Sequence, residues 1–106
     1  MENLFAYGSL REEDVQKTIF GRILKGIPEK LSGYAVKQIE IEEEFGIETY
    51  PIITPTDDNK DAIHGIVYEL TLDELQLSDT YEGNSYTRIQ VPLESKQLVW
   101  AYSAKV

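Results

Sequence analysis

The segment near the start of the chain, Asn3-Leu4-Phe5-Ala6-Tyr7-Gly8-Ser9-Leu10-Arg11, gives the first indication of the fold. Its first five residues form a short apolar run, which predicts a buried strand. Gly8-Ser9 predicts a tight turn, and residues 11–20 are predicted to form a helix that ends at Gly21. A strand that leads through a turn into a helix exposes unpaired N–H groups, so this turn can hold a carboxylate or a developing oxyanion.

Further along the chain the sequence predicts more strands and a second helix. Val15, Ile19 and Phe20 supply the buried face of the first helix. Thr71 with Glu74 three residues later forms a capping box, so a short helix begins there and ends near Tyr81. Five other segments are predicted to be extended, and Pro51 confines the second of them to an edge, a start or a bulge. These segments are residues 31–41, 50–53, 62–70, 86–93 and 98–104.

The elements amount to about six strands and two short helices, and they do not alternate regularly. That order favours an α+β fold with a mostly antiparallel, strongly curved sheet over a doubly wound parallel one. With 106 residues, the chain is expected to form one domain over residues 1–106.

Composition and charge exclude several classes of function. The chain has no cysteine, which rules out disulfides and thiolate nucleophiles and argues against a zinc site. Its apolar runs are too short to cross a bilayer, and Met1-Glu2-Asn3 lacks the basic start of a secretory signal, so a cytoplasmic location is expected. The net charge of −9 argues against binding to nucleic acids or anionic membranes.

Glu82 is a candidate acid/base residue at the predicted end of the second helix, next to Gly83. A carboxylate at the C-terminal end of a helix interacts unfavourably with the helix dipole, so a role other than stabilising the helix is indicated. Packing against Tyr81 and Tyr86 would desolvate the carboxyl group and raise its pKa, as an acid/base residue near neutrality requires. A structural alternative pairs Glu82 with Arg88, and from this stretch alone that alternative is favoured.

Other polar and aromatic residues have weaker claims to a function. His64, the sole histidine, is expected to be a half-buried strand residue, and Trp100 is expected to lie in the core. Ser9 lacks a second histidine or a lysine to activate it and is interpreted as a turn former. The aspartates between residues 57 and 61 lack the glycine and closing glutamate of a calcium loop. Four tyrosines are candidates to line a pocket, with Tyr86 the strongest: Tyr7, Tyr81, Tyr86 and Tyr102.

Taken together and in this order, the segments resemble the gamma-glutamylcyclotransferase-like family, and within it the gamma-glutamylamine cyclotransferase and avirulence-induced-gene-like branch. The similarity covers nearly the whole chain. It is carried by Leu4 to Arg11, Val15 to Arg22, and residues 50–55, 63–70 and 79–83, with Tyr86, Arg88 and Val91. One departure is Ser78, where a large apolar side chain is expected; repacking of Leu75 and Leu77 is one way to cover it.

The resemblance implies a small mixed, mostly antiparallel, barrel-like sheet with two short flanking helices. It also implies a cofactor-independent reaction without a metal, in which a gamma-glutamyl amine or small gamma-glutamyl peptide cyclises to 5-oxoproline and releases an amine. Glu82 is then the general acid/base. The residues implied to bind the substrate are Tyr7, Gly8, Ser9, Leu10 and Tyr86.

A rival interpretation is a non-catalytic family member that binds a small metabolite or a protein partner in the same pocket. A small β-barrel that binds nucleic acid is a second rival, and the charge of −9 weighs against it. The position of the Glu82 side chain separates an enzyme from the structural alternative. In an enzyme its carboxyl group should face the loop at residues 8–10 across one cavity.

Overall fold

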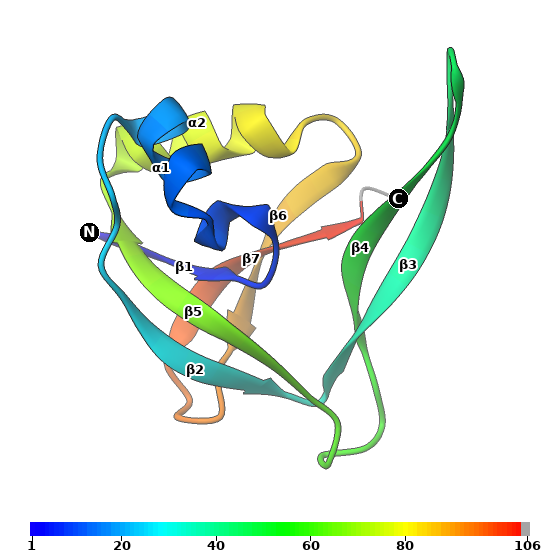
Figure 1. The fold of residues 1–106 in the computed structure, drawn as a ribbon. Coiled ribbons are helices and arrows are strands. Elements are labelled where there is room, and N and C mark those ends of the chain that lie inside the picture. The colour runs from blue at the N-terminus through cyan, green and yellow to red at the C-terminus, as the bar shows by residue number, and fades with distance from the viewer. Residues whose placement is uncertain (105–106) are drawn as a thin grey trace.

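Two helices lie on one face of a five-stranded sheet in the computed structural model of the chain, which describes residues 1–104 (Figure 1). In spatial order the strands of the sheet are β2 (Gly26–Ser32), β5 (Ala62–Leu70), β1 (Glu2–Ala6), β7 (Leu98–Ala104) and β6 (Tyr86–Pro92). Neighbouring strands are antiparallel, except that β1 and β7 are parallel. The predicted α+β class is confirmed. The sheet is curved but not closed, because β2 and β6 remain its two edges.

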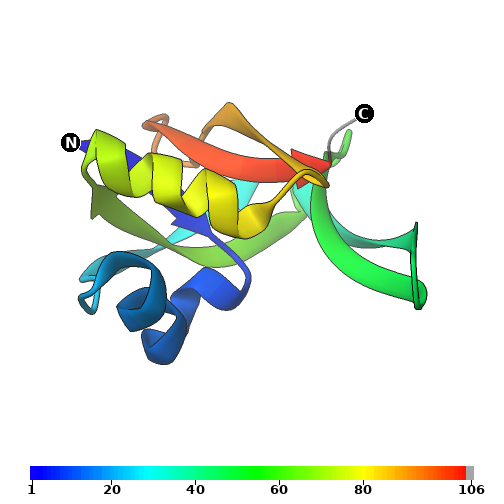
Figure 2. The ribbon, with the colours of Figure 1, turned by 90° about the horizontal axis from the view of Figure 1, so that it is seen from above.

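A two-stranded arm, β3 (Tyr34–Glu43) and β4 (Gly46–Pro55), projects away from the sheet (Figures 1 and 2). The prediction of one extended segment over residues 31–41 was wrong, since Gly33 separates β2 from β3 and gives seven strands instead of six. Gly33 has φ +79°, which a residue without a side chain adopts at little cost. Pro51 lies in β4, which within residues 1–104 pairs only with β3, so its predicted edge position is confirmed.

The first helix, α1 (Glu13–Phe20), begins two residues later than predicted. A 3₁₀ turn over Ser9–Arg11 comes before it, in which the Arg11 and Glu12 N–H groups donate to the carbonyls of Gly8 and Ser9. Gly21, at φ +71°, ends the helix as predicted. The three apolar residues predicted for its inner face are half-buried and pack against the core: Val15, Ile19 and Phe20.

The second helix, α2 (Leu72–Glu82), starts with the predicted capping box. The Thr71 hydroxyl accepts from the Glu74 N–H at 3.1 Å, and the Glu74 carboxylate accepts from the Thr71 N–H at 3.0 Å. Arg22 forms two further bonds to the same carboxylate, and these hydrogen bonds lower the pKa of Glu74 to about 2. The helix runs one residue past Tyr81, so Glu82 is its last residue. Over residues 1–104 neither helix has the length and apolarity needed to cross a membrane.

Replacing Thr71 by alanine tests how firmly this helix is anchored. We expect the free energy of unfolding to fall by about 1 kcal/mol, because the Glu74 N–H loses its acceptor. Thr80→Ala, at an exposed position near the other end of α2, is the matched control and should change stability by less than about 0.5 kcal/mol. Urea unfolding of the three proteins measures the difference. Equal losses in the two variants would show that the cap contributes nothing.

The core divides between the two faces of β1. Leu4 and Ala6 face the helices, whereas Phe5 faces the base of the arm, so both faces of the strand are buried as its apolar run predicted. The helices cover only the Leu70 end of β5. At the open end His64 is exposed beside its exposed partner Lys30, so its predicted half-buried position was wrong.

Trp100 packs against the core, as predicted, but lies at its margin. It is half-buried, and the Arg88 guanidinium lies 4.3 Å from the centroid of its ring. The ring thus forms a cation–π contact at the margin of the core, on the strand next to the one that carries Arg88.

Candidate functional site

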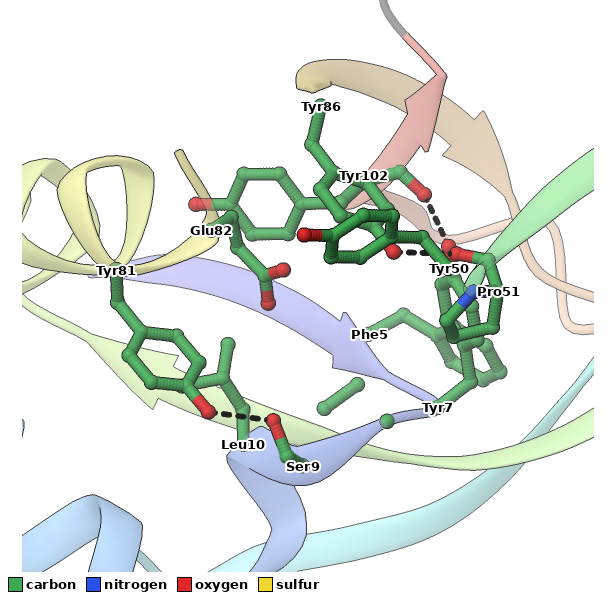
Figure 3. A pocket seen from close by; sticks show the side chains of 12 residues that line it. Phe5, Tyr7, Ser9, Leu10, Tyr50, Pro51, Tyr81, Glu82, Tyr86 and Tyr102 are labelled. Atoms are coloured by element: carbon green, nitrogen blue, oxygen red, sulfur yellow. Dashed lines mark hydrogen bonds between the residues drawn. The ribbon is translucent and has the colours of Figure 1, made fainter. Parts of the chain in front are cut away.

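A cavity of about 380 Å³ lies between the end of β1, the C-terminal end of α2 and the base of the arm (Figure 3). Half of its lining residues are aromatic, and among residues 1–104 Glu82 is the one carboxylate that lines it. The lining residues are Phe5, Ala6, Tyr7, Gly8, Ser9, Leu10, Tyr50, Pro51, Tyr81, Glu82, Tyr86 and Tyr102.

The Tyr7–Leu10 loop forms one side of the cavity, and the side chains of Arg11 and Gln16 hold it in place. The Arg11 guanidinium donates from Nε to the Gly8 carbonyl at 3.0 Å. Gln16, only 1% exposed, donates from Nε2 to the Leu10 carbonyl at 2.8 Å and accepts from the Leu24 N–H at 2.8 Å. Because both ends of this buried amide are used, the turn is fixed in place. Gln16 was not anticipated from the sequence, where it is one polar residue on an otherwise ordinary helix.

Glu82 enters the cavity from the opposite side. Its side chain is half-buried, and its carboxyl group points toward the turn that carries Ser9 and Leu10 (Figure 3). Burial raises the pKa of this carboxyl group to about 7, because the charged form loses solvation. A carboxyl group with that pKa is present in both protonation states near neutrality.

The structural alternative for Glu82, an ion pair with Arg88, was wrong. Arg88 binds Asp79 instead, with Nε 2.9 Å from Oδ1 and Nη2 3.1 Å from Oδ2. Asp79 lies almost one turn before Glu82 on α2 and takes both donors of the guanidinium fork. Glu82 is therefore left facing the cavity.

The phenol groups around Glu82 are themselves engaged in hydrogen bonds. Tyr7 donates to the Tyr102 carbonyl at 2.5 Å, and Tyr86 donates to the Pro51 carbonyl at 2.7 Å (Figure 3). Burial raises the pKa of Tyr86 to about 12 and that of Tyr7 above its usual range. These phenols are accordingly neutral at physiological pH and form an uncharged wall.

Two contacts join the walls of the cavity to one another. The Ser9 and Tyr81 hydroxyls lie 2.6 Å apart and link the loop to the last turn of α2 (Figure 3). Tyr50, from the arm, meets Tyr86 edge to face with 6.1 Å between the ring centroids. The arm is thus part of the site.

The structure brings all six site residues expected from the sequence to this one cavity, Glu82 and the five expected to bind substrate. Their roles in catalysis and binding stay predictions. Tyr81 and Tyr102, which were weaker candidates, also line it. Tyr50 and Pro51 were missed as lining residues, although their segment was among those that carried the family resemblance.

Ser78, at a position where a large apolar side chain was expected, is accommodated by hydrogen bonds. It is fully buried, and its hydroxyl donates to the Leu75 carbonyl at 2.6 Å and lies 2.6 Å from the Tyr102 hydroxyl. Leu75 is buried, but Leu77 is 47% exposed and cannot cover the site, so that part of the expectation was wrong. Among residues 1–40, 42 and 44–104, no three histidine, aspartate or glutamate side chains group together in a way that could hold a metal ion.

Comparisons with known proteins identify the family. Residues 4–106 match the family model described as gamma-glutamyl cyclotransferase, AIG2-like. AIG2-like protein B of Arabidopsis thaliana is 32% identical over 97 residues, 91% of this chain and 52% of that protein. AIG2-like protein A of the same plant is 31% identical over 86% of this chain and 51% of its own length. This chain thus spans about half the length of these relatives.

Solved structures share the fold. A solution structure of an Arabidopsis thaliana protein has a TM-score of 0.76 and 28% identity, over 97% of this chain and 61% of that one. A structure named gamma-glutamyl cyclotransferase has a TM-score of 0.71 at 15% identity, over 98% of this chain and 66% of that one, a likeness of fold alone. Since the family model matches nearly the whole chain, this protein belongs to the gamma-glutamyl cyclotransferase, AIG2-like family.

Proposed function

We propose that this protein is a gamma-glutamyl cyclotransferase, which cyclises a gamma-glutamyl amine or a small gamma-glutamyl peptide to 5-oxoproline and releases an amine. The observation that carries the proposal is the placement of Glu82. Its carboxyl group, with a pKa of about 7, faces the Ser9–Leu10 turn across a single cavity. Family membership supports the same class of reaction.

The reaction needs one group that can take up and return a proton. The α-amine of a gamma-glutamyl group has an ordinary pKa of about 8 and must lose a proton before it attacks its own γ-carbonyl carbon. The neutral amine then attacks, and as the new C–N bond forms ionised Glu82 accepts one of the two protons that the amine nitrogen still carries. Protonated Glu82 then gives a proton to the departing nitrogen as the old C–N bond breaks. The glutamate ends in its starting state, and no cofactor is required.

The loop supplies the second part of the proposed mechanism. N–H groups at the start of a helix or 3₁₀ turn have no partner within it and are suited to binding an anion. We assign the N–H groups of Gly8, Ser9 and Leu10 to the substrate carboxylate and to the oxyanion that forms at the γ-carbonyl. The nucleophile and the carbonyl belong to the same molecule, so the enzyme needs only to fold the substrate correctly.

The aromatic wall suits a small ligand. A cavity of about 380 Å³ is within the range that such ligands occupy. Tyr86, whose hydroxyl is tied to the Pro51 carbonyl, presents a fixed ring beside the proposed substrate position. The absence of cysteine from the sequence is in keeping with a reducing compartment, and we propose that the protein acts in the cytoplasm.

A panel of gamma-glutamyl amines and gamma-glutamyl peptides tests the function, with 5-oxoproline release as the measurement. We expect turnover of at least one member of the panel. The matched α-glutamyl compounds should be inert, because their α-amine cannot close a five-membered ring on the adjacent carbonyl. N-acetylated gamma-glutamyl compounds should also be inert, since the nucleophile is blocked. Saturable binding without turnover anywhere in the panel would favour a non-catalytic binding protein over the enzyme.

A further inference from the structure

Tyr102 connects the Tyr7–Leu10 loop to α2, because its backbone carbonyl binds the loop and its hydroxyl binds the helix. Its backbone carbonyl accepts a hydrogen bond from the Tyr7 hydroxyl at 2.5 Å, at the start of the loop. Its own hydroxyl donates to Asp79 Oδ1 at 2.7 Å and lies 2.6 Å from Ser78 Oγ. Ser78 and Asp79 lie four and three residues before Glu82 on α2.

We propose that Tyr102 is a positioning residue, which sets the separation between Glu82 and the Tyr7–Leu10 loop. The inference rests on the proposed function for its effect on catalysis. The structural part, that Tyr102 holds the end of α2 in place, stands independently of it.

The connection on the α2 side is buried at Ser78 and Tyr102, whereas the Asp79 side chain is 38% exposed. Ser78 is 0% exposed and Tyr102 is 5% exposed, and hydrogen bonds in such surroundings are costly to leave unmade. Asp79 also accepts two hydrogen bonds from Arg88, one on each carboxylate oxygen. Arg88 and Tyr102 are direct partners in the β6–β7 ladder, so two adjacent strands hold the same carboxylate.

The end of α2 needs such an anchor. Glu82 is the last helical residue, and Gly83 follows at φ +82°. Helix ends fray, and beyond Asp79 the last turn is tied to the loop by the exposed Ser9–Tyr81 contact. A general base must lie within hydrogen-bonding distance of the proton that it takes, and small displacements are costly. The Tyr102 bonds hold the turn from which Glu82 projects.

Removing the Tyr102 hydroxyl changes no net charge near Glu82. Burial raises the pKa values of Tyr7, Tyr86 and Tyr102, so these three phenols of the cavity wall are neutral, and Asp79 and Arg88 are paired with each other. The titratable groups that line the cavity with Glu82 are Tyr7, just after β1, Tyr50 from β4, Tyr81 from α2, Tyr86 from β6 and Tyr102 from β7. Asp79 on α2 is bound by Tyr102 and by Arg88 on β6. A change in the titration of Glu82 would therefore report on its hydration and position.

Tyr102→Phe tests the proposal, because it keeps the aromatic wall and the carbonyl that binds Tyr7 while it removes both bonds to α2. We expect kcat for 5-oxoproline release to fall about 10- to 100-fold with little change in KM. Ser78→Ala, outside the cavity lining, should lower kcat in the same direction but by less, because the bond to Asp79 remains. Tyr34→Phe is the matched control, at a half-buried position outside the cavity, and should leave kcat unchanged.

A second measurement does not depend on activity. The carboxyl group of Glu82 is titrated by carbon-13 NMR, with its signal assigned by its loss in Glu82→Gln. In Tyr102→Phe we expect the midpoint to move from about 7 toward the ordinary 4.5, because a loosened helix end admits water. Tyr34→Phe should keep the wild-type midpoint. An unchanged midpoint in Tyr102→Phe overturns the positioning role, whatever happens to stability. If wild type releases no 5-oxoproline, the proposed function fails, yet the titration still decides the role of Tyr102.

Discussion

We expect Glu82→Gln to lower kcat for 5-oxoproline release by about 10²- to 10⁴-fold, the usual contribution of a general acid/base residue. Glutamine matches glutamate in size and can still form hydrogen bonds, so the cavity keeps its shape, but the amide cannot accept the α-amine proton. KM should change little, because substrate binding is assigned mainly to the loop and the aromatic wall. The measurement is the steady-state release of 5-oxoproline from the best substrate of the panel.

Two further variants make the Glu82 result specific. Glu82→Asp keeps an ionisable carboxyl group but withdraws it by one methylene, so its loss of kcat should be partial. Glu48→Gln makes the same chemical change at an exposed position on the arm, outside the cavity lining, and should retain full activity. Near-wild-type turnover by Glu82→Gln would remove Glu82 from the mechanism and point to another proton acceptor.

Much of the fold follows from local sequence, because several elements carry their own signals. The alternation over Ala62–Leu70 and the Thr71–Glu74 capping box predict β5 and the start of α2 to the residue. Only the last two residues of β2 (Gly26–Ser32) were predicted to be extended. Pro28 and the mostly exposed side chains give this strand no clear alternation of apolar and polar residues. Residues 26–32 form a strand because they pair with β5. The two strands approach closely at Gly26, where a Cβ would come within 2.2 Å of the Ile66 side chain.

The site follows from the sequence only in part, for a related reason. Glu82 and the loop were found because the family resemblance linked two ordinary features, a helix-end carboxylate and a tight turn. Tyr50 and Pro51 were missed because they reach the cavity from the arm, whose placement depends on contacts between distant parts of the chain. The raised pKa of Glu82 likewise depends on burial by residues from several elements, which no local pattern encodes.

The same burial makes stability depend on pH through Glu82. In the unfolded chain its carboxyl group ionises near the ordinary pKa of 4.5, and in the folded protein near 7. Between these values the folded state holds a proton that the unfolded state has released. The contribution of Glu82 to the free energy of unfolding therefore falls as pH rises from 4.5 to 7 and stays at the lower level above 7.

Comparison with Glu82→Gln isolates this contribution, since every other titrating group is common to both proteins. At pH 8 we expect the variant to be the more stable by on the order of 2–3 kcal/mol, and the stability difference to shrink to nearly zero at pH 4. Urea unfolding at pH 4, 6 and 8 measures the difference, with Glu48→Gln expected to follow wild type at each pH. A stability difference that does not change with pH would mean that Glu82 titrates normally in the folded state. If the difference grows with pH while turnover is lost, the carboxyl group that destabilises the fold above neutrality is the one that the reaction requires.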